Sequence, residues 1–447
     1  MLTQESARQI TERIFLYSRA DQTEAIINNA TQSLTRYANN VITQNVHENE
    51  LIDITIRVIK NGRTAQVSFN QTDDDSLKRA LQEALILAKN QKKDPQTLPL
   101  VTRQSYEELN TYVERTTQVS PRERSETIKD AVRECAQHSL NASGIFANRA
   151  NVIVIANSKK LFNYHRITEA EFTMTAIGPN STGWAGEVNK DVSALNPLRI
   201  AQQAADKALK SKDPVSLPAG QYTVILEPAA VVEFLMFMAF NGFGAQIYQE
   251  GRSFISGKLG KKVFGDNISI MDDVYHPQNV GLPFDFEGLA RQKVLLIDKG
   301  VVKNLVYDRL TAKRDKKNST GHALPQPNAH GPLPINLVMM PGNSSLQEMI
   351  ASTPKGVLVT EFHYTNLIDP MKLTLTGMTR NGTFLIENGA ITRGLKNMRF
   401  TDSVIKALSN VELISKETKL DKGFFAGGFI APALKINGFN FSSETKF

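Results

Sequence analysis

The chain has 447 residues, of which 52 are Lys or Arg, 45 are Asp or Glu, 7 are His and 1 is Cys. This length favours two or three domains, and 41% hydrophobic with 22% charged residues is typical of a globular protein and excludes a disordered one. The single cysteine, Cys135, excludes an internal disulfide framework and a metal site built on several thiolates, and it fits a reducing compartment.

Neither a signal peptide nor a membrane span is expected from the sequence. The first residues lack a basic start followed by an apolar core, and the densest apolar run, residues 231–240, is about half of the roughly 20 residues that a spanning helix needs. We therefore expect a cytoplasmic protein without membrane contact. The net charge of +7 is spread along the chain, and Asp315 interrupts the densest basic run, so no nucleic-acid partner is expected.

The first hundred residues predict a small unit of helices and strands. Apolar residues at helical spacing after a candidate cap at Thr3 indicate a first helix. Residues 52–58 alternate apolar and polar side chains, as a half-buried strand does, and the alternation resumes at residues 65–69. Asn61-Gly62 between them predicts a tight hairpin turn, because both turn positions need positive φ.

An amphipathic helix predicted at residues 77–88 belongs to the same unit, and residues 92–99 have the composition of a linker. The segment after this linker, to residue 217, mixes helices and strands. Pro121 favours the start of a helix that should end near His138. Strand patterns then occupy residues 151–158, 160–165 and 171–177. A further helix is expected at residues 197–211.

Strand patterns dominate the remainder of the chain. A buried strand at residues 222–226 precedes a helix from about Pro228. Turn sequences separating short strands, and thus predicting hairpins and a meander, are Asp298-Lys299-Gly300, Asn381-Gly382 and Asn388-Gly389. Residues 319–334 contain four prolines and two glycines and predict a long loop, and such loops in compact domains are often functional.

Together these patterns predict an α+β protein with three domains. A small N-terminal α/β unit with a hairpin and helices occupies residues 1–98. A central α+β domain occupies residues 99–217, and a larger C-terminal domain rich in antiparallel β-sheet occupies residues 218–447.

The residues that most often carry catalysis form no evident set. The histidines lack metal-ligand spacing, and His322 and His330, eight positions apart in the long loop, are either ordinary loop histidines or brought together by folding. Cys135 lies three residues from His138, which suits a nucleophile pair, but a free cysteine is more often part of a core.

Two pairs of carboxylates flank sequence that is typical of turns. Asp272-Asp273 and Asp285 with Glu287 suit Mg²⁺ binding or acid–base catalysis, although aspartate in a turn more often accepts hydrogen bonds from its own backbone. The chain has no phosphate-binding loop, dinucleotide fingerprint or nucleophile elbow. The residues alone therefore leave the chemistry open.

Several short motifs follow one another along the chain in a specific order. They are SLTRYANNVI at 33–42, RSFISGKLG at 252–260, FDFEG at 284–288, LIDKG at 296–300, STGH at 319–322, NLVMMPG at 336–342, IENG at 386–389 and the stretch 428–438. In this order they resemble the TldD/TldE (PmbA) family, once described as modulators of DNA gyrase and understood as two-subunit metalloproteases. The resemblance covers essentially the whole chain.

The resemblance implies where a metal site would lie. In the active subunit, TldD, a helix carries His-Glu-x-x-x-His and a later cysteine completes the zinc site, with the glutamate as general base. Here Met236 and Asn241 stand where the two histidines would be, and Phe237 stands where the glutamate would be. No cysteine follows Cys135. A thioether and an amide do not replace imidazoles and a thiolate as zinc ligands.

The resemblance therefore implies a zinc-free subunit of the TldE/PmbA type that binds no cofactor itself. Such a chain would pair with a zinc-bearing TldD-type subunit or with itself as a dimer, and would help to enclose and present an unfolded peptide for cleavage. The peptide could bind by adding a strand to a sheet edge. Candidate peptide contacts are His322, His330 and Asn336. Without the zinc motif, no catalysis by this chain alone is expected.

Two alternatives remain open at the level of sequence. One is a homodimeric peptide-binding or regulatory protein with no protease partner. The other is an independent peptidase that uses a different metal or nucleophile set. A direct role toward DNA or gyrase has no support from a basic helix or stripe.

Overall fold

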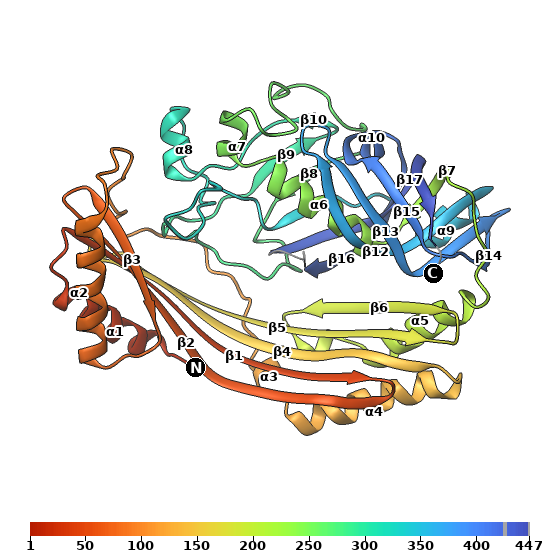
Figure 1. Cartoon of the computed structure of the whole chain (residues 1–447), viewed down its shortest axis with the longest axis horizontal. Helices are drawn as coiled ribbons and strands as arrows, with labels where there is room; N and C mark the ends of the chain where they lie inside the picture. The colour runs from red at the N-terminus through yellow and green to blue at the C-terminus, as the bar shows by residue number, and fades with distance from the viewer. Residues whose placement is uncertain (423–426, 446–447) are drawn as a thin grey trace.

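The computed structural model describes residues 1–422 and 427–445, which form two β-sheets with helices packed on them (Figure 1). In the described residues the first sheet has six strands in the order β3-β2-β1-β4-β5-β6, and every neighbouring pair is antiparallel. The strands are β1 (Gln22–Ala38), β2 (Val41–Lys60), β3 (Arg63–Phe69), β4 (Asn141–Asn157), β5 (Phe162–Ile177) and β6 (Thr182–Asn189). Strands from both of the first two predicted segments thus share one sheet.

Two pairs of helices cover one face of this long sheet. Helices α1 (Gln4–Tyr17) and α2 (Asp74–Asn90) pack over one end, and α4 (Pro121–Gln137) and α5 (Pro197–Lys210) pack over the other. Ala25 and Ile27 of β1 contact the first pair and Tyr37 contacts the second. All three positions are odd-numbered, and strand side chains alternate between faces, so both helix pairs lie on the same face. The short α3 (Glu114–Thr117) and η1 (Val192–Ala194) complete this part.

The second sheet is larger and part of it closes on itself. In the described residues its strand order is β10-β9-β8-β11-β17-β15-β13-β12-β7, with β14 beside β13 and β16 beside β17. Because β17 also pairs with β7, the strands β7, β12, β13, β15 and β17 form a closed ring. Most pairs are antiparallel, as predicted, but β12 with β7 and β11 with β17 are parallel.

The elements of this second part follow one another closely in the chain. The strands are β7 (Gly220–Leu226), β8 (Ile270–Asp272), β9 (Val294–Asp298), β10 (Val301–Val302), β11 (Leu337–Met339), β12 (Lys355–Asp369), β13 (Thr374–Glu387), β14 (Ala390–Gly394), β15 (Met398–Ser403), β16 (Val411–Lys422) and β17 (Gly428–Glu444). The helices are α6 (Pro228–Asn241), α7 (Ala245–Gln249), α8 (Arg309–Arg314), α9 (Leu346–Ala351) and α10 (Val404–Ser409).

Helix α6 is the centre of the largest hydrophobic core. Its residues from Ala230 to Ala239 are buried apart from Glu233, and it packs against β12, β16 and β17. Strand β7 shows how the ring separates two cores, because Val224 and Leu226 face the α6 core while Ile225 faces α9. A helix that is apolar on all sides must be enclosed on all sides, and the ring of strands provides most of that enclosure.

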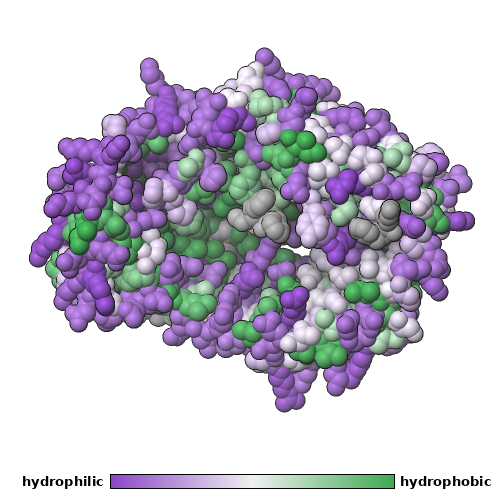
Figure 2. Space-filling view, viewed as in Figure 1, coloured by the Kyte–Doolittle hydropathy of each residue, from purple (hydrophilic) through white to green (hydrophobic). Residues whose placement is uncertain are grey.

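The two sheets meet at apolar and ionic contacts, but they leave a hollow between them. Phe284 packs on Ile155 of β4, and Val188 of β6 packs on Ile430 of β17. Lys422 of β16 lies 3.4 Å from Glu171 of β5. Figure 2 shows the face of the molecule hollowed at its centre, between the C-terminal part above and the long sheet below, with hydrophobic residues on the wall.

Several local predictions from the sequence are confirmed. The Thr3 hydroxyl accepts a hydrogen bond from the backbone N–H of Ser6 at 3.1 Å and so caps α1. Asn61 and Gly62 have φ of 51° and 71° and join β2 to β3. Asn388-Gly389 likewise joins β13 to β14. Residues 319–334 contain no helix or strand, as expected for the long loop.

One prediction about turns is wrong, whereas the strand patterns at residues 160–165 and 171–177 are confirmed from Phe162 onward. Both belong to the single strand β5, which pairs with β4 without a break up to Ile177. Asn381-Gly382 does not reverse the chain but lies inside β13, with φ of 51° and 128°. Strand β12 continues past this point with a register shift between Val359 and Glu361, so the dipeptide forms a bulge.

In the described part of the chain, no helix combines the length and the apolar character needed to cross a membrane. This includes α6, which is apolar throughout but has only 14 residues.

Arg124 links α4 to the first sheet through buried hydrogen bonds, and replacing it should destabilise the protein. Its side chain is fully buried and donates hydrogen bonds to Thr35 Oγ1 at 2.9 Å, Val119 O at 3.0 Å and Asn148 Oδ1 at 3.1 Å. We expect Arg124→Ala to lower the free energy of unfolding by about 3 kcal/mol, because these acceptors lose their donor inside the protein. Urea unfolding followed by circular dichroism measures the change.

Arg122 on the same helix supplies the matched control. It is 87% exposed and pairs with Glu126 across one helical turn. Arg122→Ala should change stability by less than about 0.5 kcal/mol. Equal losses in the two variants would show that the buried network around Arg124 contributes nothing beyond an ordinary surface arginine.

Candidate functional site

Local sequence explains where α6 begins and ends. Glu227 precedes it, and Pro228 occupies the first turn, where its missing N–H costs no hydrogen bond. Lys207 of α5 forms an ion pair with Glu227 at 2.7 Å, which ties the start of α6 to the first sheet's helices. At the other end a Cβ on Gly242 would lie 2.3 Å from the Phe254 ring, so only glycine allows the chain to turn away there.

The three α6 side chains singled out from the sequence contact the protein core or their own helix. Met236 is 3% and Phe237 6% exposed, within the large core. Asn241 donates its amide N–H to the backbone oxygen of Phe237 at 2.9 Å, one turn back in the helix.

These side chains do not fit a zinc ion of the kind that TldD-type subunits hold. No histidine lies between His165 and His276 in the sequence, and the only cysteine is buried elsewhere, in the core under α4. Within residues 1–422 and 427–445, no group of three or more His, Cys, Asp or Glu side chains could hold a metal ion. The donors required for a zinc site are therefore not assembled around α6 in the described structure.

One open cleft brings together three residues that the sequence analysis had named separately. Phe237, Asn241 and His330 line a cleft of ≈ 740 Å³ beside the C-terminal end of α6. His330 is exposed and comes from the long loop. Folding therefore brings the loop to the same cleft as two of the helix positions named from the sequence.

The other two candidate peptide contacts lie in a buried polar network and not in the cleft. His322 is 1% and Asn336 2% exposed. His322 Nε2 lies 2.9 Å from Asp272 Oδ1, and the backbone N–H of Asn336 donates to Asp272 Oδ2 at 2.9 Å. A role of His322, His330 or Asn336 in peptide contact stays a prediction. The observed role of His322 and Asn336 is to bind Asp272 inside the protein.

Asp272 is the anion at the centre of this network. Burial by itself would raise its pKa, but the charge of Arg291, 3.1 Å away, and the contacts with His322 and Asn336 lower the pKa to about 2. Burial, together with the nearby Arg291, lowers the pKa of His322 against the pull of Asp272. The carboxylate is thus ionised and holds the long loop, β8 and the start of β11 together.

The second carboxylate pair also has a structural explanation. Asp285 Oδ1 accepts hydrogen bonds from the backbone N–H groups of Glu287 at 3.0 Å and Leu289 at 2.9 Å, which confirms the turn interpretation. Its other oxygen accepts from the N–H of Ala323 in the long loop at 2.9 Å. Burial raises the pKa of Asp285 to about 6. Cys135 is 0% exposed, and burial raises its pKa to about 11, so its interpretation as a core residue is confirmed.

Sequence reasoning missed a set of carboxylates near the start of α6. Burial, and then the proximity of Asp421, raise the pKa of Glu233 and of Glu361 to about 7. Glu233 Oε2 has no hydrogen-bond partner among the described residues. The available signal was that Glu233 interrupts an otherwise apolar run, which is unusual for a residue on a buried helix.

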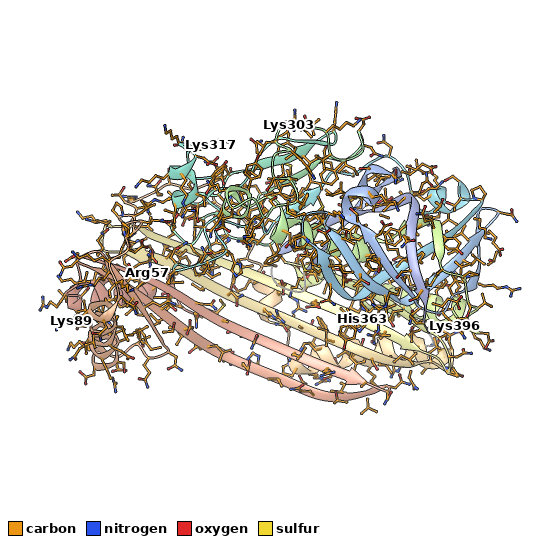
Figure 3. All side chains as sticks on the ribbon, turned by 45° about the horizontal axis from the view of Figure 1, so that its top comes forward. Arg57, Lys89, Lys303, Lys317, His363 and Lys396 are labelled. Carbon is orange, nitrogen blue, oxygen red and sulfur yellow. The ribbon has the colours of Figure 1, made fainter. Side chains whose placement is uncertain are left out.

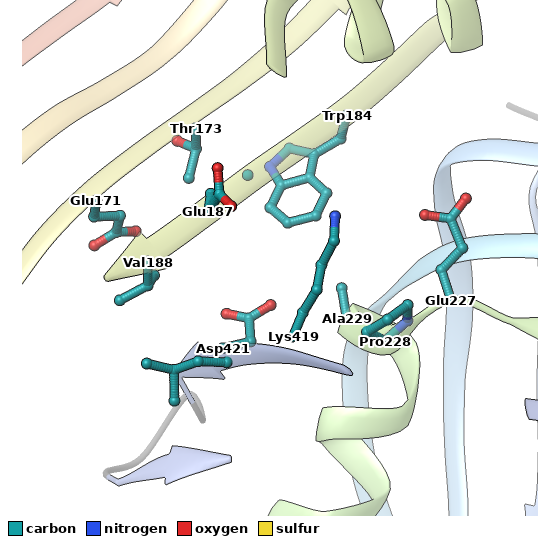
Figure 4. A pocket seen from close by; sticks show the side chains of 12 residues that line it. Glu171, Thr173, Trp184, Glu187, Val188, Glu227, Pro228, Ala229, Lys419 and Asp421 are labelled. Atoms are coloured by element: carbon teal, nitrogen blue, oxygen red, sulfur yellow. The ribbon is translucent and has the colours of Figure 1, made fainter. Parts of the chain in front are cut away.

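A small pocket between the two sheets lies next to these carboxylates. It has a volume of ≈ 70 Å³, and its wall includes Glu171, Trp184, Glu227, Lys419 and Asp421. Figure 4 shows Trp184 from β6 and Lys419 and Asp421 from β16 around the same space, beside the start of α6. A space of this size holds a few water molecules and no peptide side chain of ordinary size.

Of the lysines labelled in Figure 3, Lys89 lies at one end of the molecule, Lys396 towards the other, and Lys303 and Lys317 along the top edge. A nucleic-acid footprint would instead need a continuous basic patch or stripe.

Comparison with known proteins identifies the family. Sequence models of three PmbA/TldA metallopeptidase domains match the chain in order: domain 1 at residues 23–88, the central domain at 111–212 and the C-terminal domain at 219–443. The last match alone covers just over half of the 447 residues. The chain belongs to this family.

Relatives in the PmbA/TldA family carry metalloprotease names. A metalloprotease of Methanocaldococcus jannaschii is 24% identical over 322 residues, which are 69% of this chain and 70% of that protein. A TldD homologue of Haemophilus influenzae is 26% identical over 54% of this chain and 52% of its own length. A zinc metalloprotease TldD homologue of Saccharolobus solfataricus is 30% identical over 52% of each chain. The chain thus spans about half the length of these two TldD homologues.

Two crystal structures share the PmbA/TldA fold over nearly the whole chain. A protein described as a modulator of a DNA gyrase, from Thermotoga maritima, has a TM-score of 0.86 and 22% identity, covering 97% of this chain and 99% of that one. TldE from Thermococcus kodakarensis has a TM-score of 0.86 and 20% identity, covering 98% and 99%. At these identities the likeness establishes the fold.

The Asp272 network predicts the cost of removing its anion. Asp272→Asn leaves Arg291 buried without its carboxylate partner, and we expect a loss of about 3–5 kcal/mol in the free energy of unfolding. Urea unfolding measures it. Asp266→Asn serves as control, because the Asp266 side chain is 80% exposed and pairs with Lys262 at the surface. A loss no larger than that of the control would contradict a central role for Asp272.

Replacing Glu233 with Gln should increase stability in a way that depends on pH. Its pKa is raised in the folded state, so its protonated form contributes stability that is present below about pH 4.5 and lost as pH rises through about 7. Glu233→Gln should therefore raise the melting temperature at pH 8 and leave it nearly unchanged at pH 4.5.

Thermal melts at several pH values measure this difference. Glu126→Gln, on an exposed side chain, is the control and should show no such dependence. An equal shift of the Glu233→Gln variant at both pH values would mean that Glu233 ionises normally in the folded protein.

Proposed function

We propose that this chain is the zinc-free, TldE-type subunit of a TldD/TldE metalloprotease. It pairs with a zinc-bearing TldD-type subunit and helps to enclose and present an unfolded peptide, which the partner cleaves. The complex works in the cytoplasm. This reducing compartment suits a chain whose single cysteine is free and buried.

One observation carries this proposal. The family is a metallopeptidase family, yet the helix positions that would hold the metal are Met236, Phe237 and Asn241. Two of these side chains are packed in the core, and the third is hydrogen-bonded to its own helix. A member of a hydrolytic family that keeps the fold but lacks the ligands is expected to act through a partner that has them.

The shape of the molecule supports a role in enclosure. The hollow seen in Figure 2 lies between the long sheet and the C-terminal part. A second subunit placed over this face would complete a chamber. A chamber formed by two subunits admits extended chains and excludes folded proteins, which suits a protease for unfolded peptides.

Copurification of the tagged full-length chain with a TldD-type protein from the same genome tests this proposal. The expected result is a stable complex with zinc bound to the partner, cleavage of an unfolded peptide by the complex only, and loss of cleavage with a chelator. Met236→Leu, a volume-conserving change, should leave this cleavage within about twofold of the original.

Other outcomes separate the competing functions. A stable homodimer that binds peptide without cleavage, in a genome that lacks a TldD-type gene, would favour the homodimeric binding or regulatory protein. Stoichiometric metal in the chain alone, with cleavage that Met236→Leu abolishes, would overturn the zinc-free assignment.

A further inference from the structure

The ≈ 740 Å³ cleft at the end of α6 has apolar walls that the sequence analysis did not anticipate. Its lining includes Leu367 near the end of β12, Pro370 and Met371 at the turn that follows, and Ile247 of α7. Met371 is 46% exposed, so part of this apolar lining is open to solvent. Clefts of several hundred Å³ with exposed apolar residues at the rim are typical of ligand sites.

A cationic group lines the same cleft. The Arg252 side chain is 61% exposed and donates its Nε–H to Glu250 at 2.8 Å, with a second N–H on the same carboxylate. A guanidinium has five N–H groups, so three remain for another acceptor. His330 lines the same cleft and adds an imidazole N–H as a further donor. The cleft therefore combines apolar walls with donors suited to a carboxylate.

We propose that this cleft binds the C-terminal end of an unfolded peptide. The terminal carboxylate lies on Arg252, and the apolar side chains of the last two residues lie against Leu367 and Met371. The inference rests on the proposed function for one point only, which is that the ligand is a peptide.

The arrangement favours a chain end over an acidic side chain. Apolar walls and guanidinium line a single cleft, so the ligand must present an apolar group and a carboxylate close together. The last residue of a peptide has both on one carbon atom, and its planar carboxylate matches the guanidinium geometry. Every unfolded chain offers such an end, so capture there demands little of the sequence.

Isothermal titration of the full-length chain with two defined probes tests the proposal. The probes are N-acetyl-Leu-Phe with a free carboxylate and the same dipeptide as its C-terminal amide. We expect the acid to bind about tenfold more tightly than the amide, because only the acid forms charge-assisted hydrogen bonds with Arg252.

Two variants test separately where the carboxylate and the apolar side chains of the ligand bind. Arg252→Gln should reduce the affinity for the acid to that for the amide and leave the amide unchanged. Met371→Asp, at the exposed rim, should weaken both probes about tenfold. Arg122→Gln is the matched control, since Arg122 is also an exposed arginine paired with a glutamate, and it should change neither. Melting curves establish that each variant is folded.

Several results would overturn the inference. These are no saturable binding of either probe, equal affinity for acid and amide, or equal effects of Arg252→Gln and Arg122→Gln. Tight binding of N-acetyl-Asp-Phe-amide, which has no free C-terminal carboxylate, would show that the cleft binds acidic side chains and not the end of a chain. The titration uses this chain alone, so its failure leaves the copurification result standing, and a failed copurification leaves the titration standing.

Discussion

Helix α6 has apolar side chains around nearly its whole circumference, and such a helix is stable only when protein surrounds it on every side. The closed ring of β7, β12, β13, β15 and β17 provides much of that enclosure and presents alternate residues to α6. The rest of the fold follows from this burial. Glu227 at the start of α6 binds Lys207 of the helices on the first sheet, and the end of α6 opens into the cleft.

The same burial changes the chemistry of the charged groups around the helix. Glu233 and Glu361 lie where water is scarce and Asp421 is near, so their carboxyl groups hold their protons near neutral pH. Asp272 is fully buried, yet it is ionised because Arg291 and His322 lie against it. Burial alone therefore does not decide the charge of a carboxylate in this protein, and the nearest cation does.

One pair of identical dipeptides shows how far local sequence could be trusted. Asn61-Gly62 and Asn381-Gly382 both adopt positive φ, as their residue types favour. The first reverses the chain because β2 and β3 pair across it, whereas the second forms a bulge because β12 pairs with residues on both sides of it. The local conformation was predictable in both places. The path of the chain depended on a strand some twenty residues away.

The sequence by itself determined the five longer helices α1, α2, α4, α5 and α6, the first hairpin, the long loop and the absence of histidine at the α6 positions, because these depend on residue type and short-range spacing. Only the tertiary structure decided that His322 joins a buried network while His330, in the same loop, reaches the cleft. It also decided that Leu367 and Met371 line the same cleft as Ile247 of α7. Such placements follow from long-range strand pairing and from the burial of α6. Both depend on contacts between residues far apart in the sequence, so no short stretch predicts them.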